Sequence, residues 1–173
     1  MNNLLLTKEQ IEKITELQTE LDIRVRKNND ISMEQDLNLE KYIALKTEFF
    51  EFVNEIESFK YWKKNKGKSH ILEEACDTMH FIFSLAIDNK AKIELKDNMF
   101  KGFKIEEYEM IDLMGVTDAV ISDVYAEQNW EDLSIVLSFI LIMINKCGFT
   151  ATDLYKEYVR KNKINHDRQA NNY

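Results

Sequence analysis

The sequence predicts an all-α fold of one domain, residues 1–173, and three observations support this prediction. The 173 residues include no proline and only 4 glycines, so the chain has few of the residues that break helices or shape tight turns. Apolar residues recur at helical spacing along most of the chain, and strand-like alternation extends over no useful length. A chain of this length buries roughly two-thirds of its unfolded surface as a single domain.

The first helix is expected over the stretch TKEQIEKITELQTELDIRV. Thr7 stands three residues before Gln10, which is the spacing of a capping box at a helix start. An apolar stripe follows at helical spacing, made of Ile11, Ile14, Leu21 and Val25. Gln18 lies inside this stripe, where it either bonds to the backbone at the boundary of the core or serves a functional site.

Five further helices are expected, over about residues 37–64, 70–89, 106–126, 130–146 and 151–161. The polar stretch KNNDISMEQDLN precedes the first of these, and NKGKSH separates it from the next. Apolar residues nearly encircle the helix over 70–89, which predicts that it is buried. Residues 90–104 are irregular, Asn129 is expected to cap the helix over 130–146, and Gly148 is expected to close it.

Composition and charge exclude several classes of function. The net charge of −8 argues against duplex nucleic acid as a partner, because phosphate backbones recruit Lys and Arg. The first residues lack the pattern of a signal peptide, and the longest apolar run, residues 133–144, is shorter than the ~20 residues that cross a bilayer. Cys76 and Cys147 fit neither a metal knuckle nor a disulfide framework. We therefore expect a cytoplasmic protein that binds neither nucleic acid nor a membrane.

Two pairs of acidic residues stand on helices that are rich in apolar residues. Glu48 and Glu51 are three residues apart, as are Glu74 and Asp77, so each pair shares one helix face. Buried carboxylates require a cationic partner, and the helix over 70–89 contains no Lys or Arg of its own that could form a salt bridge. Four converging carboxylates suit Mg²⁺. A di-iron site is the weaker interpretation, because the chain offers only one related motif, Asp77-x-x-His80.

Two basic runs accompany these acids. Residues 60–68 carry five lysines and no acid, and residues 156–168 carry five basic residues against two acids. Either run alone is typical of a solvated surface. Together with the acidic quartet they indicate an anionic ligand that extends from the metal to the lysines, and a polyphosphate is the natural candidate.

At these residues the chain resembles the dimeric all-α dUTPases of the MazG-like nucleoside triphosphate pyrophosphatase superfamily, above all their phage and Gram-positive branch. EFFEFVNEIESFKYW resembles the first metal motif of that family, and EEACDTMHFIFSL resembles the second. LQTEL is similar to the N-terminal segment that frames the base, and YVRKNKINHDRQANNY is similar to the C-terminal signature. Tyr173 matches the final aromatic residue of that signature, whereas Asn172 stands where the family usually has Gly.

The resemblance implies a helical bundle of the dimeric dUTPase type and hydrolysis of dUTP to dUMP and pyrophosphate. Water would attack the α-phosphate with the help of Mg²⁺, which would be held by Glu48, Glu51, Glu74 and Asp77. The residues implied around uracil and deoxyribose are Gln18, Trp62, His80 and Phe81. Those implied at the phosphates are Lys60, Lys161, Asn165 and Arg168. A quartet carboxylate that is not fully committed to metal can act as general base, and Glu48 is our choice.

Two alternatives remain open on the sequence alone. The first is a MazG-like pyrophosphatase that acts on another nucleotide, since the residues that would select the base lie on several segments. The second is a phage regulatory protein that uses the same fold to bind a repressor, for which residues 96–129 carry no recognised motif and are free to serve. The apolar run over 133–144 is expected to lie in the core or across a dimer interface. The resemblance implies a homodimer and favours a contribution of this run to its interface.

Overall fold

The all-α prediction is confirmed by the computed structural model, which describes residues 4–64, 69–95 and 107–170. These residues form helices and connections, and no strand occurs among them. The helices are α1 (Lys8–Asn28), α2 (Asn38–Ile56), α3 (Ile71–Asp88), α4 (Met110–Glu127), the 3₁₀ helix η2 (Trp130–Asp132), α5 (Leu133–Lys146) and α6 (Ala151–Ala170).

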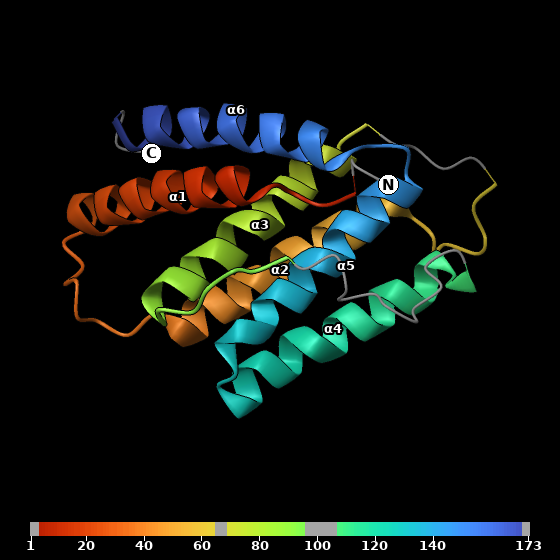
Figure 1. Cartoon of the computed structure of the whole chain (residues 1–173), viewed down its shortest axis with the longest axis horizontal. Helices are drawn as coiled ribbons and strands as arrows, with labels where there is room; N and C mark the ends of the chain where they lie inside the picture. The colour runs from red at the N-terminus through yellow and green to blue at the C-terminus, as the bar shows by residue number, and fades with distance from the viewer. Residues whose placement is uncertain (1–3, 65–68, 96–106, 171–173) are drawn as a thin grey trace.

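Helix α3 lies at the centre of the bundle. It packs against α1, α2, α5 and α6, while α4 packs against α2 and α5. In Figure 1, α1 and α6 lie side by side along one edge of the bundle and α4 lies along the opposite edge. The core follows from this arrangement, because α3 contributes buried residues on most of its circumference, as its apolar pattern predicts.

The expected signals at two helix ends are confirmed. The Thr7 side chain accepts a hydrogen bond from the Gln10 backbone N–H at 3.2 Å, and the Gln10 side chain accepts one from the Thr7 N–H at 2.9 Å. Gly148 follows α5 with a φ of +93°, a conformation that side chains other than that of glycine rarely adopt. Asn129 instead precedes η2, and its side chain contacts Asp132 at 2.8 Å without capping the backbone.

The predicted end of the second helix was wrong. Helix α2 ends at Ile56, eight residues before the expected boundary, because Glu57 adopts a left-handed φ of 59°. The buried Glu57 carboxylate then accepts hydrogen bonds from Lys60 at 2.9 Å and Lys63 at 2.6 Å. These ion pairs fold residues 57–63 into a loop. Helix α6 is longer than predicted and continues to Ala170, nine residues beyond the expected end.

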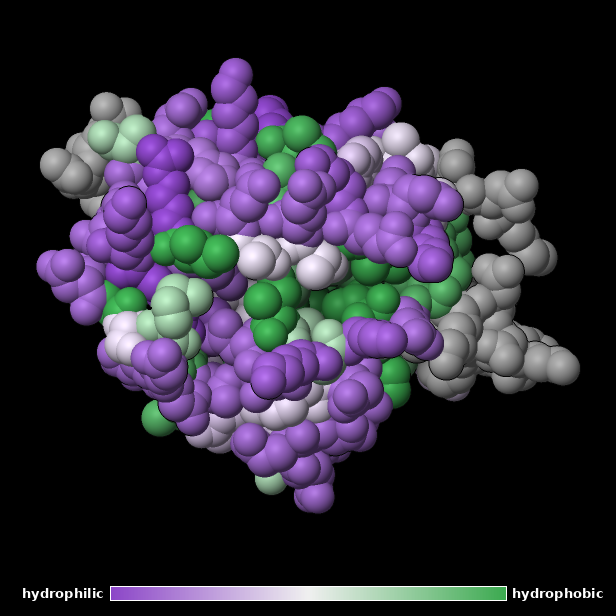
Figure 2. All heavy atoms as spheres, turned by 60° about the vertical axis from the view of Figure 1, so that its left-hand side comes forward, coloured by the Kyte–Doolittle hydropathy of each residue, from purple (hydrophilic) through white to green (hydrophobic). Residues whose placement is uncertain are grey.

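The apolar run over 133–144 forms most of α5 and is buried within the single chain, apart from the half-buried Ile135. Packing inside the core therefore accounts for its composition. Figure 2 shows one face of the molecule, on which hydrophilic side chains predominate between smaller hydrophobic patches. Among the described residues no single helix has both the length and the hydropathy to cross a membrane, and only the bent pair Trp130–Lys146 and Ala151–Ala170 meets these criteria jointly.

Candidate active site

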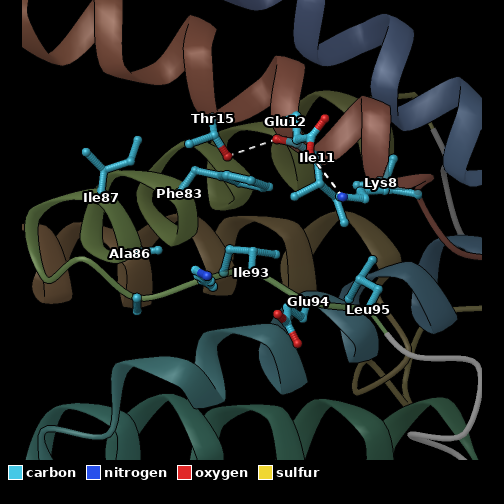
Figure 3. A pocket seen from close by; sticks show the side chains of 13 residues that line it. Lys8, Ile11, Glu12, Thr15, Phe83, Ala86, Ile87, Ile93, Glu94 and Leu95 are labelled. Atoms are coloured by element: carbon cyan, nitrogen blue, oxygen red, sulfur yellow. Dashed lines mark hydrogen bonds and ion pairs between the residues drawn. The ribbon is translucent and has the colours of Figure 1, made fainter.

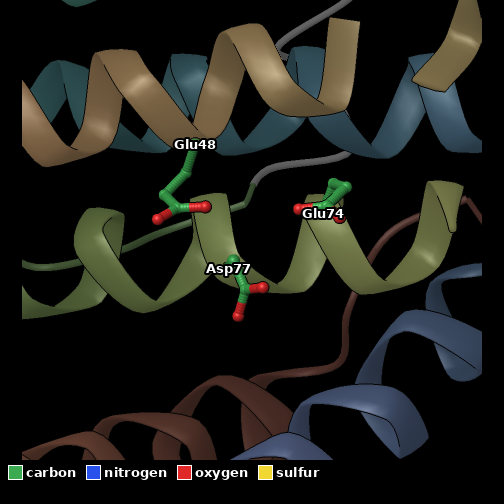
Figure 4. A group of neighbouring side chains, drawn as sticks. All are labelled: Glu48, Glu74 and Asp77. Carbon is green, nitrogen blue, oxygen red and sulfur yellow. The ribbon is translucent and has the colours of Figure 1, made fainter. Parts of the chain in front are cut away.

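Three carboxylates converge between α2 and α3. Glu48 projects from α2 toward α3, which carries Glu74 and Asp77 (Figure 4). One oxygen of each lies within 4.8 Å of one oxygen of each of the others. Three carboxylate oxygens at this separation can hold one metal ion, and hard divalent cations prefer such ligands.

The packing of α2 on α3 explains why the acids meet. Phe49 and Phe52 of α2 and Ala75 and Met79 of α3 are fully buried, and these neighbours fix the rotation of both helices. The acids border this apolar seam at helical spacing, so they emerge at its edge and remain partly exposed. Glu51 is exposed on α2 and is not among the three that lie within 4.8 Å of one another.

The cluster carries more negative charge than its surroundings favour. Partial burial, followed by the charges of Asp77, Glu51 and Glu74, raises the pKa of Glu48 from its ordinary value of 4.5 to about 7. Burial is also the main cause that raises the pKa of Glu74 and of Asp77. Glu51 adds to this effect on Glu48 and Glu74, so its charge belongs to the cluster even though its side chain lies apart.

A lysine from α6 supplies a cation to one side of the cluster. Lys161 Nζ lies 2.7 Å from Asp77 Oδ2 and 3.0 Å from Glu73 Oε1, and its side chain is only 7% exposed. The hydrogen bond from Lys161 lowers the pKa of Glu73. The salt bridge that α3 cannot form with a cation of its own is thus formed with α6. One lysine does not balance the charge of three clustered carboxylates, so further positive charge would stabilise the cluster.

Gln18 and His80 meet in the interior between α1 and α3. The Gln18 side-chain oxygen lies 2.7 Å from His80 Nδ1 and accepts a hydrogen bond from the Tyr158 hydroxyl at 2.6 Å. The Tyr158 ring stacks on the imidazole with a centroid separation of 4.4 Å. Burial, with the nearby charge of Lys161, lowers the pKa of His80 to about 3, so the ring is neutral. Phe81 is half-buried next to it on α3.

Tyr158 and Asp22 belong to this group but were missed at the level of sequence. Asp22 accepts a hydrogen bond from Gln18 Nε2 at 2.7 Å, so both residues contact a predicted site residue. The only signal was the position of Gln18 inside an apolar stripe, which indicates a buried polar partner without identifying it. Tyr158 lies 140 residues away along the chain, beyond the reach of any local pattern.

The predicted phosphate contacts lie on two segments. Lys161, Asn165 and Arg168 follow one another at intervals of four and three along α6, which places them on one side of the helix. The pKa of Asp77 is raised mainly by burial, and the positive charge of Arg168 offsets a small part of this rise, so Arg168 lies close enough to act on the cluster. Lys60 lies in the loop after α2, where its ammonium group is held 2.9 Å from Glu57.

Trp62 lies in the same loop and is 64% exposed, with its ring against those of Tyr61 and Phe59. The structure therefore brings His80 and Phe81 close to the carboxylates along α3, whereas Trp62 and Lys60 remain on a surface loop. Tyr173, Lys66 and Lys68 fall outside the described residues.

A separate pocket of about 700 Å³ lies between α1, α3 and residues 91–95 (Figure 3). Its walls are mainly apolar, with Phe83, Ile93 and Leu95 among them, and Lys8 and Glu12 pair near it at 3.6 Å. The residues that line it, all within the described ranges, include none of the predicted site residues. The carboxylate cluster is therefore the candidate site.

Comparison with known proteins gives one result that bears on function. A protein-family model described as dUTPase matches residues 10–173, a range that contains the carboxylate cluster, the Gln18–His80 pair and the cations of α6. A search of curated proteins found no match.

Proposed function

The chain belongs to the dUTPase family, whose reaction is the hydrolysis of dUTP to dUMP and pyrophosphate, and we propose that the carboxylate cluster carries out this reaction with Mg²⁺. The observation that supports the site is the convergence of Glu48, Glu74 and Asp77 within 4.8 Å. Three oxygen ligands on two rigid helices fit the preference of Mg²⁺ for carboxylates supplemented by substrate phosphates. Glu51, one turn from Glu48 on α2, is proposed as the fourth acid of the set.

The donor chemistry fits a divalent ion. Burial and then mutual repulsion raise the pKa of Glu48 and of Glu74, and positive charge at the cluster would stabilise both ionised carboxylates. When bound, Mg²⁺ lowers the pKa of a coordinated water and offsets the charge that develops on the phosphates. Water attacks the α-phosphorus, the bond between this phosphorus and the bridging oxygen breaks, and its electron pair leaves with pyrophosphate. Glu48 accepts the proton of the water through a carboxylate oxygen that is not committed to the metal.

The cations of α6 are proposed to bind the triphosphate. Lys161 already lies beside Asp77, so a phosphate oxygen near the cluster lies within reach of its ammonium group. Asn165 and Arg168 continue the same side of α6 and extend the binding surface along the helix. Lys60 is proposed as a contact from the loop after α2, where Glu57 positions it.

The uracil and deoxyribose are proposed to lie against His80 and Phe81, with Trp62 closing the pocket from its loop. Phe81 follows Asp77 by one turn on α3, so its ring is placed to pack against the sugar and to leave no room for a 2′-hydroxyl. Gln18 is 3% exposed, and its side chain is bonded to His80, Tyr158 and Asp22. We therefore assign its influence on the base to its contact with His80.

A homodimer is the proposed assembly. Leu39, Ile43 and Phe50 lie along one side of α2 and are each half or more exposed, at 53%, 53% and 50%. An exposed apolar stripe of this kind is typical of an interaction surface.

The proposed function is tested with a panel of deoxynucleoside and ribonucleoside triphosphates, each assayed with Mg²⁺ and with a chelator. We expect Mg²⁺-dependent release of pyrophosphate from dUTP and strong rejection of dCTP, dTTP and UTP. Hydrolysis of dCTP as fast as dUTP would replace the assignment with a broader nucleotide pyrophosphatase. Full activity in the presence of chelator would exclude the metal site.

A further inference from the structure

A series of hydrogen bonds, part-buried at Asp22 and buried at His80, connects the Asp22 carboxylate of α1 to the His80 ring of α3. The Gln18 amide stands between them, with Nε2 at 2.7 Å from Asp22 Oδ1 and Oε1 at 2.7 Å from His80 Nδ1. The other Asp22 oxygen accepts a hydrogen bond from the Ser84 hydroxyl at 2.6 Å and lies 3.5 Å from Lys41 Nζ. Two donors therefore support the charged carboxylate from its far side.

The chemistry of these groups fixes the direction of every hydrogen bond. An ionised carboxylate only accepts, so the side of Gln18 that faces Asp22 must be its NH₂ group. The carbonyl oxygen then faces His80, and His80 Nδ1 must carry the proton that it donates. Tyr158 agrees with this orientation, because its hydroxyl donates to the same Gln18 oxygen. A neutral imidazole protonated at Nδ1 has its lone pair at Nε2.

His80 Nε2 is buried and has no hydrogen-bond partner among the described residues. Buried polar atoms are almost always satisfied in native proteins, so an atom of this kind indicates a ligand or an ordered water. The low pKa of His80 is consistent with a neutral ring whose Nε2 accepts a hydrogen bond.

We propose that Asp22 is a positioning residue, which acts through Gln18 to hold His80 as the Nδ1–H tautomer and so presents Nε2 to the substrate base as a hydrogen-bond acceptor. This inference rests on the proposed function, which places the base against His80. Uracil carries an N–H donor at N3, whereas cytosine carries a lone pair there. An acceptor at this position binds the former and repels the latter, so Asp22 becomes a determinant of the preference for dUTP over dCTP. Thymine has the same N3–H, and its rejection requires the bulk of its methyl group.

The substitution Asp22→Asn tests the direction of the hydrogen bonds. The Asn oxygen remains with the two donors, Ser84 and Lys41, so its NH₂ group faces Gln18. The Gln18 amide must then turn over and present its own NH₂ group to His80, which moves the imidazole proton from Nδ1 to Nε2. We expect the selectivity ratio of kcat/KM for dUTP over dCTP to fall by about tenfold or more, since one hydrogen bond changes from attraction to repulsion.

The tautomer is measured directly from the imidazole ¹⁵N chemical shifts, without substrate, in a chain with only 3 histidines. We expect Nδ1 protonation in the wild type and Nε2 protonation in Asp22→Asn. Ser84→Ala is the matched control: it removes one bond to Asp22 but keeps the carboxylate, so the wild-type tautomer and selectivity should persist. Circular dichroism confirms that each variant is folded.

The outcomes separate this inference from the proposed function. An Nε2–H tautomer in the wild type, or no change of tautomer in Asp22→Asn, overturns the role of Asp22. A tautomer that inverts without any change in the dUTP to dCTP ratio overturns the contact between Nε2 and the base. A wild-type protein with the Nδ1–H tautomer but without hydrolysis of dUTP would refute the proposed function while the tautomer assignment stands.

Discussion

Replacing Glu48 with Gln should stabilise the metal-free protein at alkaline pH. The pKa of Glu48 rises from 4.5 to about 7 on folding, mainly because of burial and then because of the neighbouring acids. A carboxyl group whose pKa is higher in the folded state contributes stability below about pH 4.5, and this contribution disappears as the pH rises through about 7. Above that pH the folded protein must hold a charge that its surroundings disfavour. The amide introduced by Glu48→Gln carries no such charge, so the effect is removed.

The magnitude follows from the size of the pKa change. A rise of about 2.5 corresponds to about 3.4 kcal/mol in a fully enclosed site. Glu48 is only partly enclosed, and solvent screening reduces the expected gain to about 1–2 kcal/mol at pH 8. For a chain of this size the gain corresponds to a rise in Tm of roughly 2–8 °C. Near pH 4.5 the two proteins should differ little.

Thermal unfolding in the presence of chelator, followed by circular dichroism at pH 5 and pH 8, measures this difference. Glu131→Gln, which changes an exposed carboxylate on η2, is the control and should shift Tm equally little at both pH values. Addition of Mg²⁺ should stabilise the wild type more than Glu48→Gln, because the variant lacks one ligand. A metal-free variant less stable than the wild type at pH 8, or a difference independent of pH, would refute the electrostatic account of the cluster.

Three further predictions concern the metal, the sugar and the assembly. Glu74→Gln and Asp77→Asn should each abolish Mg²⁺-dependent hydrolysis and leave a folded protein, and full activity of both at saturating Mg²⁺ in a pyrophosphate-release assay would contradict the metal assignment. Phe81→Ala should raise kcat/KM for UTP relative to dUTP, within the roughly 10–200-fold that steric exclusion provides, and an unchanged ratio would reduce Phe81 to core packing. Light scattering at micromolar concentration should give about twice the chain mass of 20.5 kDa, and a value near one chain mass would refute the homodimer.

The sequence was sufficient to predict those helices whose position follows from their own apolar periodicity. The sequence predicts a helix over 70–89, and α3 spans Ile71–Asp88. The prediction holds because the apolar residues that indicate this helix are also the ones that bury it at the centre of the bundle. The end of α2 could not be predicted in this way. It depends on the backbone of Glu57 and on ion pairs with Lys60 and Lys63, and the helical pattern of the stretch continues past it.

The convergence of three of the four predicted acids could also be predicted from the sequence. The spacing of Glu74 and Asp77, and the placement of Glu48 on the adjacent helix, were enough to indicate a carboxylate cluster. The separation of Glu51 from that cluster depends on side-chain conformation, which the spacing of residues along the sequence does not determine. Tyr158 and the contacts of Lys161 depend on how α6 lies against α1 and α3, and such packing between distant segments leaves no local signature.

The central position of α3 also restricts how the lengths of related chains can vary. One residue inserted into an α-helix turns all following side chains by about 100° and moves them about 1.5 Å along the axis. In α3 such an insertion before Asp77 would carry the acid out of the cluster, and the same shift would put the polar Thr78 and Ser84 in the buried places of Met79 and Leu85. The carboxylates and the packing residues of α3 thus depend on the same helical register. We expect insertions and deletions in homologous genes to avoid α3 and to accumulate in connections such as residues 29–37, where added length leaves the helix registers unchanged.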